Sequence, residues 1–279
     1  MKITGEALPK QFCQLLGDTS LLQQTRRRVS LTIDENRILT TLTRTHRRFY
    51  APMLRGVAAR NLVVQPEGRG TAPAILYSLL RLAATTPRAQ VAIFPSDHFI
   101  EDDLKFMGHV EMAFSATTLR PELTVLLGIA PQWPEPAYGW IEPGEAIGET
   151  PACMVRRFWE KPRRELAGEL LRRGCLWNSF VMVGQLSTLL GLFLVALPEL
   201  FLAFKKIRPV IGTAFEENTI ERLYADLRPS GFSERVLAEH PVNLAVLPVH
   251  GVAWSDLGEP HRVMDTIART GIRPKWMAA

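Results

Sequence analysis

The sequence predicts an α/β protein with a mainly parallel sheet that is covered by helices. Short apolar runs typical of buried strands alternate with segments whose apolar residues recur at helical spacing. The chain has 279 residues, 47% hydrophobic and 22% charged, close to the averages of globular proteins and sufficient for a sizeable core. One compact, soluble domain of enzyme size is therefore expected over residues 1–279.

The first half of the chain alternates regularly between the two kinds of element. Ser20 is a predicted N-cap, and apolar residues follow it at helical spacing, so a helix is expected over 20–29. After it we expect strands at 37–42, 61–65, 91–94 and 124–129, separated by helices near 46–57, 71–84 and 102–118. The run 91–94 is entirely apolar, as in a buried parallel strand. Because ligands of such sheets bind beyond the carboxyl ends of strands, Asp97 lies at a candidate site.

The second half has a different composition. Residues 131–162 are richer in Pro, Gly, Trp and Glu, which favours loops and antiparallel strands set against the sheet. Helices at 163–173, 185–196 and 215–226 and strands at 179–183 and 244–248 are expected after it. The most apolar stretch, 188–197, is about ten residues long, whereas a helix that spans a membrane needs about 20. It is therefore interpreted as a buried helix, and no membrane partner is expected.

The charge of the chain is concentrated near its start. The formal net charge is +5, and residues 1–60 hold eleven Lys and Arg against four acids. The basic residues Arg26–Arg28, Arg44, Arg47 and Arg48 are not accompanied by a zinc finger or an RNP motif, so no nucleic-acid partner is expected. We expect them on solvated helix faces, or near a site that attracts phosphorylated small molecules.

The cysteine content and the first residues of the sequence indicate where in the cell the protein is expected. Cys13, Cys153 and Cys175 are too few and too scattered for a disulfide framework or a C-x-x-C metal site. Met1–Lys10 has no apolar core of signal-peptide length. A reducing cytoplasm is the expected location.

Two acids are candidate metal ligands. Asp97 follows a predicted strand, and Asp256 lies in the turn W-S-D-L-G. Mg²⁺ typically takes one or two protein carboxylates together with substrate phosphates and water, so this pair suits it. The alternative for Asp97 is an Asx-turn or a helix N-cap. The neighbouring His98 is interpreted as a structural hydrogen-bonding residue and is left out of the site.

Two charged segments suit anions. Arg69, Gly70 and Thr71 precede a predicted helix, whose N-terminal N–H groups can receive a phosphate; an ordinary loop and cap is the alternative. Glu160 and Lys161 offer an acid and a cation that can hold the hydroxyls and the phosphate of a sugar phosphate. An exposed ion pair is the alternative for the second segment.

Two further segments suit a sugar. Tyr138 and Gly139 place a ring beside a glycine, where a ligand can approach the backbone; packing of the ring in the core is the alternative. Asn178 can hydrogen-bond hydroxyls through its amide, although an Asn near a strand start is usually part of a turn.

The order and wording of these segments resemble one family. The chain is similar to the sugar-1-phosphate nucleotidyltransferases, and among them to the bacterial mannose-1-phosphate guanylyltransferases. Seven blocks in the family's order carry this resemblance: L-P-K-Q-F-C at 8–13, G-R-G-T-A-P-A at 68–74, P-S-D-H at 95–98, Y-G-W-I-E-P-G at 138–144, F-W-E-K-P at 158–162, W-N-S-F at 177–180 and W-S-D-L-G at 254–258.

The resemblance implies a Rossmann-like nucleotidyltransferase fold with helices on both faces of the sheet. Its nucleotide half would cover about 1–130, and its sugar-phosphate half about 131–279. The implied reaction joins GTP and mannose 1-phosphate into GDP-mannose and pyrophosphate, with Mg²⁺ and without a covalent enzyme intermediate. The resemblance implies Lys10 and Asp97 for catalysis, and Asp97 and Asp256 for the metal. The residues implied for the nucleotide are Lys10, Arg69, Gly70, Thr71, Ser96 and Asp97. Those implied for the sugar phosphate are Tyr138, Gly139, Glu160, Lys161 and Asn178.

One departure from the family concerns the start of the sequence. The family opens with a central strand that runs into a loop G-G-x-G-x-R-L around the triphosphate, whereas Met1–Leu8 contains the single glycine Gly5. The resemblance therefore implies a gap in the sheet and no measurable transfer by the chain as written. Either the start of a longer protein is placed too late, which we favour, or the chain is a non-catalytic sugar-nucleotide-binding relative. Another base or sugar phosphate, and a homo-oligomer, also stay open.

Overall fold

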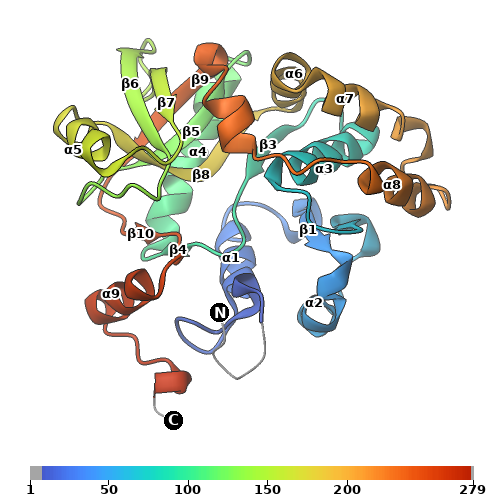
Figure 1. Ribbon diagram of the computed structural model, residues 1–279, viewed down its shortest axis with the longest axis horizontal. Coiled ribbons are helices and arrows are strands. Elements are labelled where there is room, and N and C mark those ends of the chain that lie inside the picture. Colours follow the sequence, from blue (N-terminus) through green and yellow to red (C-terminus); the bar gives the residue numbers. More distant parts are fainter. Residues whose placement is uncertain (1–7, 278–279) are drawn as a thin grey trace.

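The computed structural model describes residues 8–277, so Gly5 lies outside the described residues. Its centre is a six-stranded sheet (Figure 1). The strands lie in the order β3 (Gln90–Ile93), β8 (Leu176–Gln185), β5 (Thr124–Ile129), β9 (Leu244–Val249), β7 (Cys153–Trp159) and β6 (Trp140–Ala146). Strand β6 also pairs with the start of β8, which partly closes the sheet.

The pairing of these strands corrects the prediction of a mainly parallel sheet. Within the described part of the six-stranded sheet, β5 and β9 are the one parallel pair, and the other pairings are antiparallel. The expected buried parallel strand at 91–94 is also wrong. Strand β3 runs antiparallel to β8, and its four residues are half-buried, because β8 is its sole neighbour among the described strands. The α/β class itself is confirmed.

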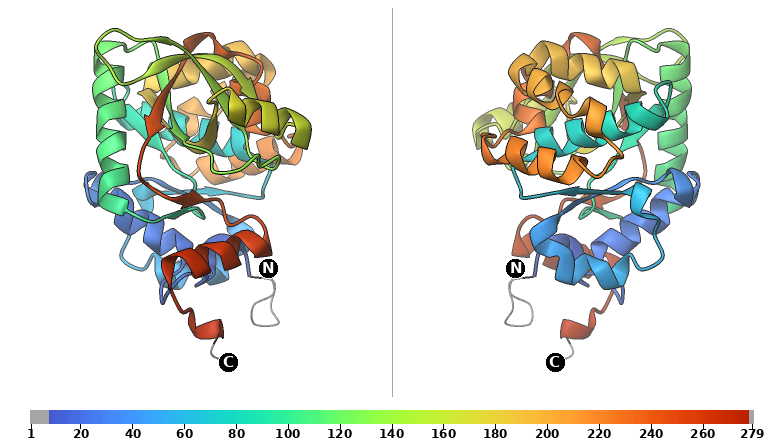
Figure 2. Two further views of the ribbon diagram at one scale, coloured as in Figure 1. Left: turned by 90° about the vertical axis from the view of Figure 1, so that its left-hand side faces the viewer. Right: turned by 90° about the vertical axis from the view of Figure 1, so that its right-hand side faces the viewer.

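Helices cover both faces of the sheet, as predicted (Figure 2). The helices are α1 (Leu21–Val29), α2 (Arg47–Met53), α3 (Thr71–Thr85), α4 (Asp103–Leu119), α5 (Arg164–Arg172), α6 (Leu186–Ala196), α7 (Pro198–Lys205), α8 (Glu216–Ala225) and α9 (Pro260–Thr270). Leu126 and Val246 join a core with α3, α6 and α8. Their neighbours Leu127 and Ala245 join a second core with α4 and α5. This alternation follows from the period of two in a strand.

Two small sheets lie beside the large one. Strand β1 (Thr40–Thr43) pairs in parallel with β2 (Leu62–Gln65), and β4 (Phe99–Ile100) pairs antiparallel with β10 (Trp254–Ser255). Among the described residues, β1 and β3 do not pair with each other, so β1 and β2 form a sheet of their own. Figure 1 shows α1, α2 and α9 beneath these small sheets.

Most predicted elements are present, with shifted ends. Ser20 caps α1 in a capping box with Gln23. The predicted strand at 37–42 begins at Thr40 instead, because Glu35–Arg37 form a 3₁₀ turn capped by Asp34. The predicted helix at 46–57 ends at Met53. The antiparallel strands expected within 131–162 are β6 and β7, whereas α7, α9, β4 and β10 were not predicted.

The basic residues near the start have structural partners. Arg28 is buried and its Nε lies 2.5 Å from the Asp103 carboxylate, so it is not on a solvated face. Arg26 donates a hydrogen bond to Thr40, and Arg44 pairs with glutamates of α8. No helix in residues 8–277 is long and apolar enough to cross a membrane. The stretch 188–197 is buried along one face of α6, with Val195 exposed on the other.

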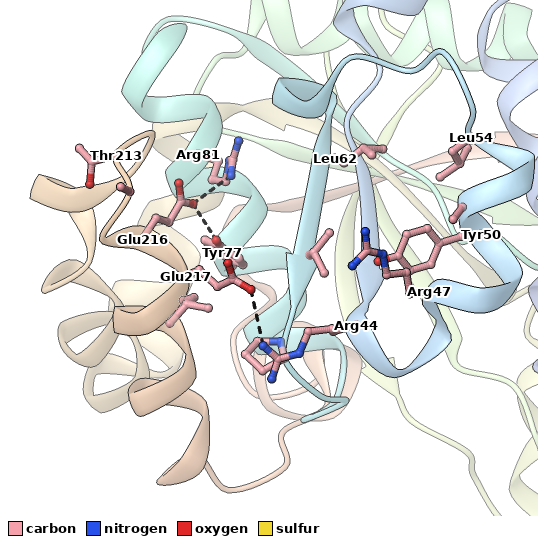
Figure 3. Close-up of a pocket in the computed structure, with 15 residues that line it drawn as sticks. Arg44, Arg47, Tyr50, Leu54, Leu62, Tyr77, Arg81, Thr213, Glu216 and Glu217 are labelled. Atoms are coloured by element: carbon pink, nitrogen blue, oxygen red, sulfur yellow. Dashed lines mark hydrogen bonds and ion pairs between the residues drawn. The ribbon is translucent and has the colours of Figure 1, made fainter.

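A cavity of about 590 Å³ lies between β2, α2, α3 and α8 (Figure 3). One side of the cavity is a hydrogen-bond network around the buried carboxylate of Glu216. This carboxylate accepts hydrogen bonds from Tyr77 at 2.6 Å and Arg81 at 3.0 Å. The other carboxylate oxygen accepts the N–H of Gly212 at 2.7 Å. Burial raises the pKa of Tyr77, and the Glu216 charge raises it further. The network joins α3 to α8. Arg44 and Arg47 of the basic group line this cavity, whereas none of the residues predicted for the nucleotide, the sugar phosphate or the metal does.

The variant Tyr77→Phe is expected to lower the free energy of unfolding by about 1–2 kcal/mol, because the buried Glu216 carboxylate loses one charge-assisted hydrogen bond. Urea denaturation measures this change. Tyr224→Phe is the matched control, since that hydroxyl contacts the neutral amide oxygen of Gln65 at 3.1 Å. An equal loss in both variants would contradict the importance of the charged acceptor.

Candidate active site

Lys10 contacts both predicted metal ligands, Asp97 through its carboxylate and Asp256 through its main chain. The Lys10 ammonium lies 2.9 Å from Oδ2 of Asp97 and donates a hydrogen bond to the main-chain carbonyl of Asp256. Lys10 begins a short 3₁₀ turn, Asp97 follows β3, and Asp256 follows β10. Residues 246 positions apart in the chain are thus brought together.

The Asx-turn or N-cap alternative for Asp97 is not what the structure shows. The N-cap of α4 is Asp102, whose carboxylate accepts the N–H of Lys105 at 2.9 Å. Asp97 instead faces the Lys10 ammonium and is about a third exposed. Ser96 lies half-buried in the same turn. The carboxylate of Asp97 is therefore open to a ligand.

The Asp256 carboxylate is held by several groups. Its Oδ1 accepts hydrogen bonds from the Tyr138 hydroxyl at 3.2 Å and the Gly258 N–H at 2.9 Å. Nε of Arg262 lies 3.1 Å from the same oxygen. Burial and the Asp256 charge both raise the pKa of Tyr138, so its hydroxyl keeps its proton and donates. Sequence reasoning missed Arg262, which lies on the unpredicted helix α9.

The ring of Tyr138 packs in the core rather than against an open pocket. It is 4% exposed and makes edge contacts with Trp177 and Trp254, with ring centroids 5.0 and 4.8 Å away. This corrects the expectation that the ring flanks a sugar, because little of its face is open to a ligand. Its hydroxyl reaches the site through Asp256.

Gly139, Glu160 and Asn178 come together next to this cluster. The carbonyl of Gly139 accepts the N–H of Asn178 at 2.8 Å. A Cβ on Gly139 would lie 3.1 Å from Glu160 Oε2 and 2.9 Å from the ring of Phe158, so this position is closely packed. Burial raises the pKa of Glu160, and the nearby Glu234 raises it further. The three residues therefore form one polar wall.

The Lys161 ammonium and the Asn178 amide nitrogen are available to a ligand, whereas the Asn178 amide oxygen already accepts a hydrogen bond. Lys161 Nζ is 3.8 Å from Glu160 and its side chain is 67% exposed, so it is free to meet an anion. Asn178 Oδ1 accepts the N–H of Phe180 at 3.0 Å, which is the turn chemistry given as the alternative. Its amide nitrogen makes no hydrogen bond within residues 8–277 and stays available as a donor.

The predicted nucleotide loop is anchored to a distant segment. Ser230 donates its N–H to the Arg69 carbonyl at 3.0 Å, and the N–H of Phe232 bonds to Thr71 Oγ1 at 2.8 Å. The Arg69 guanidinium pairs with Glu67 at 2.8 Å. Gly70 adopts φ +88° at the start of α3. Sequence reasoning did not identify the segment 230–232, because nothing local marks it.

His98 packs beside Asp97, but its buried Nδ1 makes no hydrogen bond among the described residues, so the structural hydrogen bond expected of it is not seen. Its ring makes an edge contact with Trp254 at 5.4 Å, and Nε2 is 3.8 Å from Asp97. Burial lowers the pKa of His98, so the ring is neutral near pH 7.

The donor set around Lys10 fits a hard divalent cation. A cation, the ammonium, already contacts an Asp97 carboxylate oxygen and the Asp256 carbonyl. These are oxygen donors, which Mg²⁺ prefers. No group of three or more His, Cys, Asp or Glu that suits a metal occurs among the described residues, so water and substrate phosphates would complete the shell.

Comparison with known proteins identifies the family. The family described as "Nucleotidyl transferase" matches residues 2–270 of this chain. The chain belongs to this nucleotidyl transferase family. A curated relative, the mannose-1-phosphate guanylyltransferase RfbM of Salmonella typhimurium, is 30% identical over 92% of this chain and 53% of its own length.

Two further proteins are similar over most of this chain. The xanthan biosynthesis protein XanB of Xanthomonas campestris is 29% identical over 96% of this chain and 57% of its own. A Thermus thermophilus structure described as a mannose-1-phosphate geranyltransferase superposes with a TM-score of 0.78 at 28% identity, covering 90% of this chain and 70% of that one. The chain spans about half the length of the curated relatives it matches. The resemblance to the sugar-1-phosphate nucleotidyltransferases is thereby confirmed.

Proposed function

We propose that this nucleotidyl transferase joins GTP and mannose 1-phosphate into GDP-mannose and pyrophosphate with Mg²⁺. Relatives in Salmonella that are 30% identical carry the name mannose-1-phosphate guanylyltransferase. The observation that carries the proposal is the continuity of the site. The Lys10, Asp97 and Asp256 cluster touches Tyr138, and the next residue, Gly139, packs against Glu160 and Asn178.

The reaction needs charge neutralisation and positioning. A phosphate oxygen of the sugar phosphate attacks the α-phosphorus of GTP, and the bond to pyrophosphate breaks. Asp97 and Asp256 would hold Mg²⁺, which would supply charge stabilisation at the reacting phosphates. Lys10 adds an ammonium 2.9 Å from Asp97, and in this proposal that ammonium meets the triphosphate. Arg69, Gly70, Thr71 and Ser96 line the nucleotide in this proposal.

In this proposal the sugar phosphate binds against the polar wall of Gly139, Glu160 and Asn178. Glu160 accepts hydrogen bonds from sugar hydroxyls, the Asn178 amide donates one, and the exposed Lys161 ammonium meets the phosphate. Gly139 completes this wall, since the absence of a Cβ lets Phe158 and Glu160 pack directly against its backbone. Because two reactants are bound side by side, their reaction becomes effectively unimolecular.

A product assay tests the proposal. The chain is incubated with GTP, mannose 1-phosphate and Mg²⁺, and GDP-mannose and pyrophosphate are quantified. A version with an apolar strand and a G-G-x-G-x-R-L loop joined ahead of Met1 is assayed beside it. UTP, dTTP and glucose 1-phosphate replace GTP and mannose 1-phosphate in parallel reactions. GDP-mannose from either version supports the proposal, and its absence from both, or a preference for another pair, overturns it.

The variant Lys161→Ala is expected to raise the KM for mannose 1-phosphate by about 10- to 100-fold, the effect of one charge-assisted hydrogen bond. The KM for GTP should stay unchanged, because Lys161 lies beside Glu160 rather than beside Lys10. Arg163→Ala, two residues along and also exposed, is the matched control. A rise in the KM for GTP with no change for the sugar phosphate would show that this segment is misplaced.

A further inference from the structure

We propose that Arg262 is a positioning residue for the transfer reaction, a role that rests on the proposed function. It fixes the Asp256 carboxylate and the loop 131–139 in one arrangement. Its guanidinium lies 3.1 Å from Asp256 Oδ1 and 3.3 Å from Glu135 Oε2. Its Cζ also lies 4.9 Å from the ring centroid of Tyr138.

The burial of this group is the first observation. The Arg262 side chain is 5% exposed, and that of Glu135 is 11% exposed. Nε and Nη1 of Arg262 make no aligned hydrogen bonds among the described residues, so the contacts are ion pairs held by charge. A buried ion pair costs desolvation energy and is weak evidence for stability, since apolar residues often serve as well. A role in the adjacent site explains a cation at this place.

The second observation is the orientation of Asp256. Three groups converge on Oδ1: the Tyr138 hydroxyl, the Gly258 N–H and the Arg262 guanidinium. No hydrogen bond or ion pair engages Oδ2 within residues 8–277. Arg262 therefore helps to fix the carboxylate so that one defined oxygen is left for the metal. Groups that orient a ligand in this way tune metal affinity without touching the metal.

The third observation is the anchoring of the sugar-phosphate loop. The carboxylate of Glu135 accepts the N–H of Ala137 at 3.0 Å, and its carbonyl accepts Nε1 of Trp140 at 2.8 Å. Glu135 thus shapes the loop that carries Tyr138 and Gly139. Because Arg262 contacts Glu135 and Asp256 at once, the sugar-phosphate side and the metal side are held at a fixed distance from each other.

Gly258 leaves space for this arrangement. A Cβ on Gly258 would lie 2.6 Å from Nη2 of Arg262 and 2.8 Å from Oδ2 of Asp256. Both distances are too short for a real contact, so any side chain here must push the guanidinium or the carboxylate aside. Gly258→Ala therefore disturbs the pair while every charge is kept.

The experiment compares Arg262→Gln, Arg262→Lys and the control Arg269→Gln, which changes an exposed arginine of the same helix. Mn²⁺ affinity is measured by electron paramagnetic resonance, and kcat and both KM values are measured by pyrophosphate release. In Arg262→Gln we expect Mn²⁺ affinity and kcat to fall by about 10- to 100-fold each, as for other groups behind a metal ligand. The KM for mannose 1-phosphate should also rise. Arg262→Lys should recover part of the loss because it keeps the charge.

Gly258→Ala keeps the experiment decisive if Arg262 variants fold poorly. It should lower Mn²⁺ affinity and kcat in the same direction, with the melting temperature checked in parallel. An arginine that only stabilises the fold would lower the melting temperature and leave Mn²⁺ affinity and kcat unchanged, and that result overturns the inference. An inactive parent chain that binds neither Mn²⁺ nor substrates would instead overturn the proposed function, and the inference with it.

Discussion

In the version with the strand and the G-G-x-G-x-R-L loop joined ahead of Met1, Asp97→Asn and Asp256→Asn are each expected to lower Mg²⁺-dependent nucleotidyl transfer by about 10³-fold, the scale of metal stabilisation at a reacting phosphate. Asp97 provides a carboxylate oxygen 2.9 Å from the Lys10 ammonium. Asp256 meets the same ammonium through its main-chain carbonyl, and its carboxylate Oδ2 makes no hydrogen bond or ion pair within residues 8–277. A neutral amide is a far weaker ligand for Mg²⁺ than a carboxylate, so the loss should persist at saturating Mg²⁺.

Both variants should remain folded, so a loss of transfer reports on the reaction rather than on the stability of the fold. The amide oxygen of Asn can still accept the hydrogen bonds that reach Asp256 Oδ1 from Tyr138 and Gly258. Asp102→Asn is the matched control, because it caps α4 and Asn is an equally good N-cap. Product formation, Mn²⁺ affinity and the melting temperature are measured together. Near-parental turnover in either variant would remove that residue from the proposed metal site.

The part of the fold that the sequence predicts well is local. Helix α1 follows from the Ser20 cap and helical spacing, and β5 and β9 follow from short apolar runs bounded by turns. The direction of β3 does not follow in this way, because an apolar run is compatible with parallel or antiparallel neighbours. Its neighbour is β8, more than 80 residues away, so the chain path decides the pairing.

Contacts between residues far apart in the chain also limit the prediction of the site from the sequence. Residues inside short motifs, such as Lys10, Asp97 and Asp256, can be proposed from the sequence because their surroundings are informative, and the structure brings these three together. Arg262 is not found, because its meaning depends on Glu135, 127 positions earlier in the chain. The ring of Tyr138 shows the opposite error, since an aromatic residue beside a glycine suits a sugar pocket as well as a core. Long-range contacts decide both cases.

Gly70→Ala is expected to destabilise the fold by about 2–4 kcal/mol and to weaken GTP binding, because it combines backbone strain with overpacking. Gly70 adopts φ +88° and ψ 178°, a region that only glycine occupies readily. A Cβ there would collide with the carbonyl of Ser230, whose carbon atom would lie 2.8 Å away. The loop 69–71 and the segment 230–232 would have to separate.

That separation acts on the start of α3, where the proposal places the nucleotide phosphates. The N–H of Ala72 donates to the Ser230 carbonyl at 3.1 Å, and Phe232 N–H donates to Thr71, so the added methyl group disturbs both bonds. The melting temperature should fall by roughly 5–10 °C for a chain of this size. Gly68→Ala is the control, since no atom lies within 4 Å of its Cβ and its φ is not positive; it should be neutral or slightly stabilising. If both variants melt alike and bind GTP alike, the contact between Gly70 and Ser230 does not hold this loop in place.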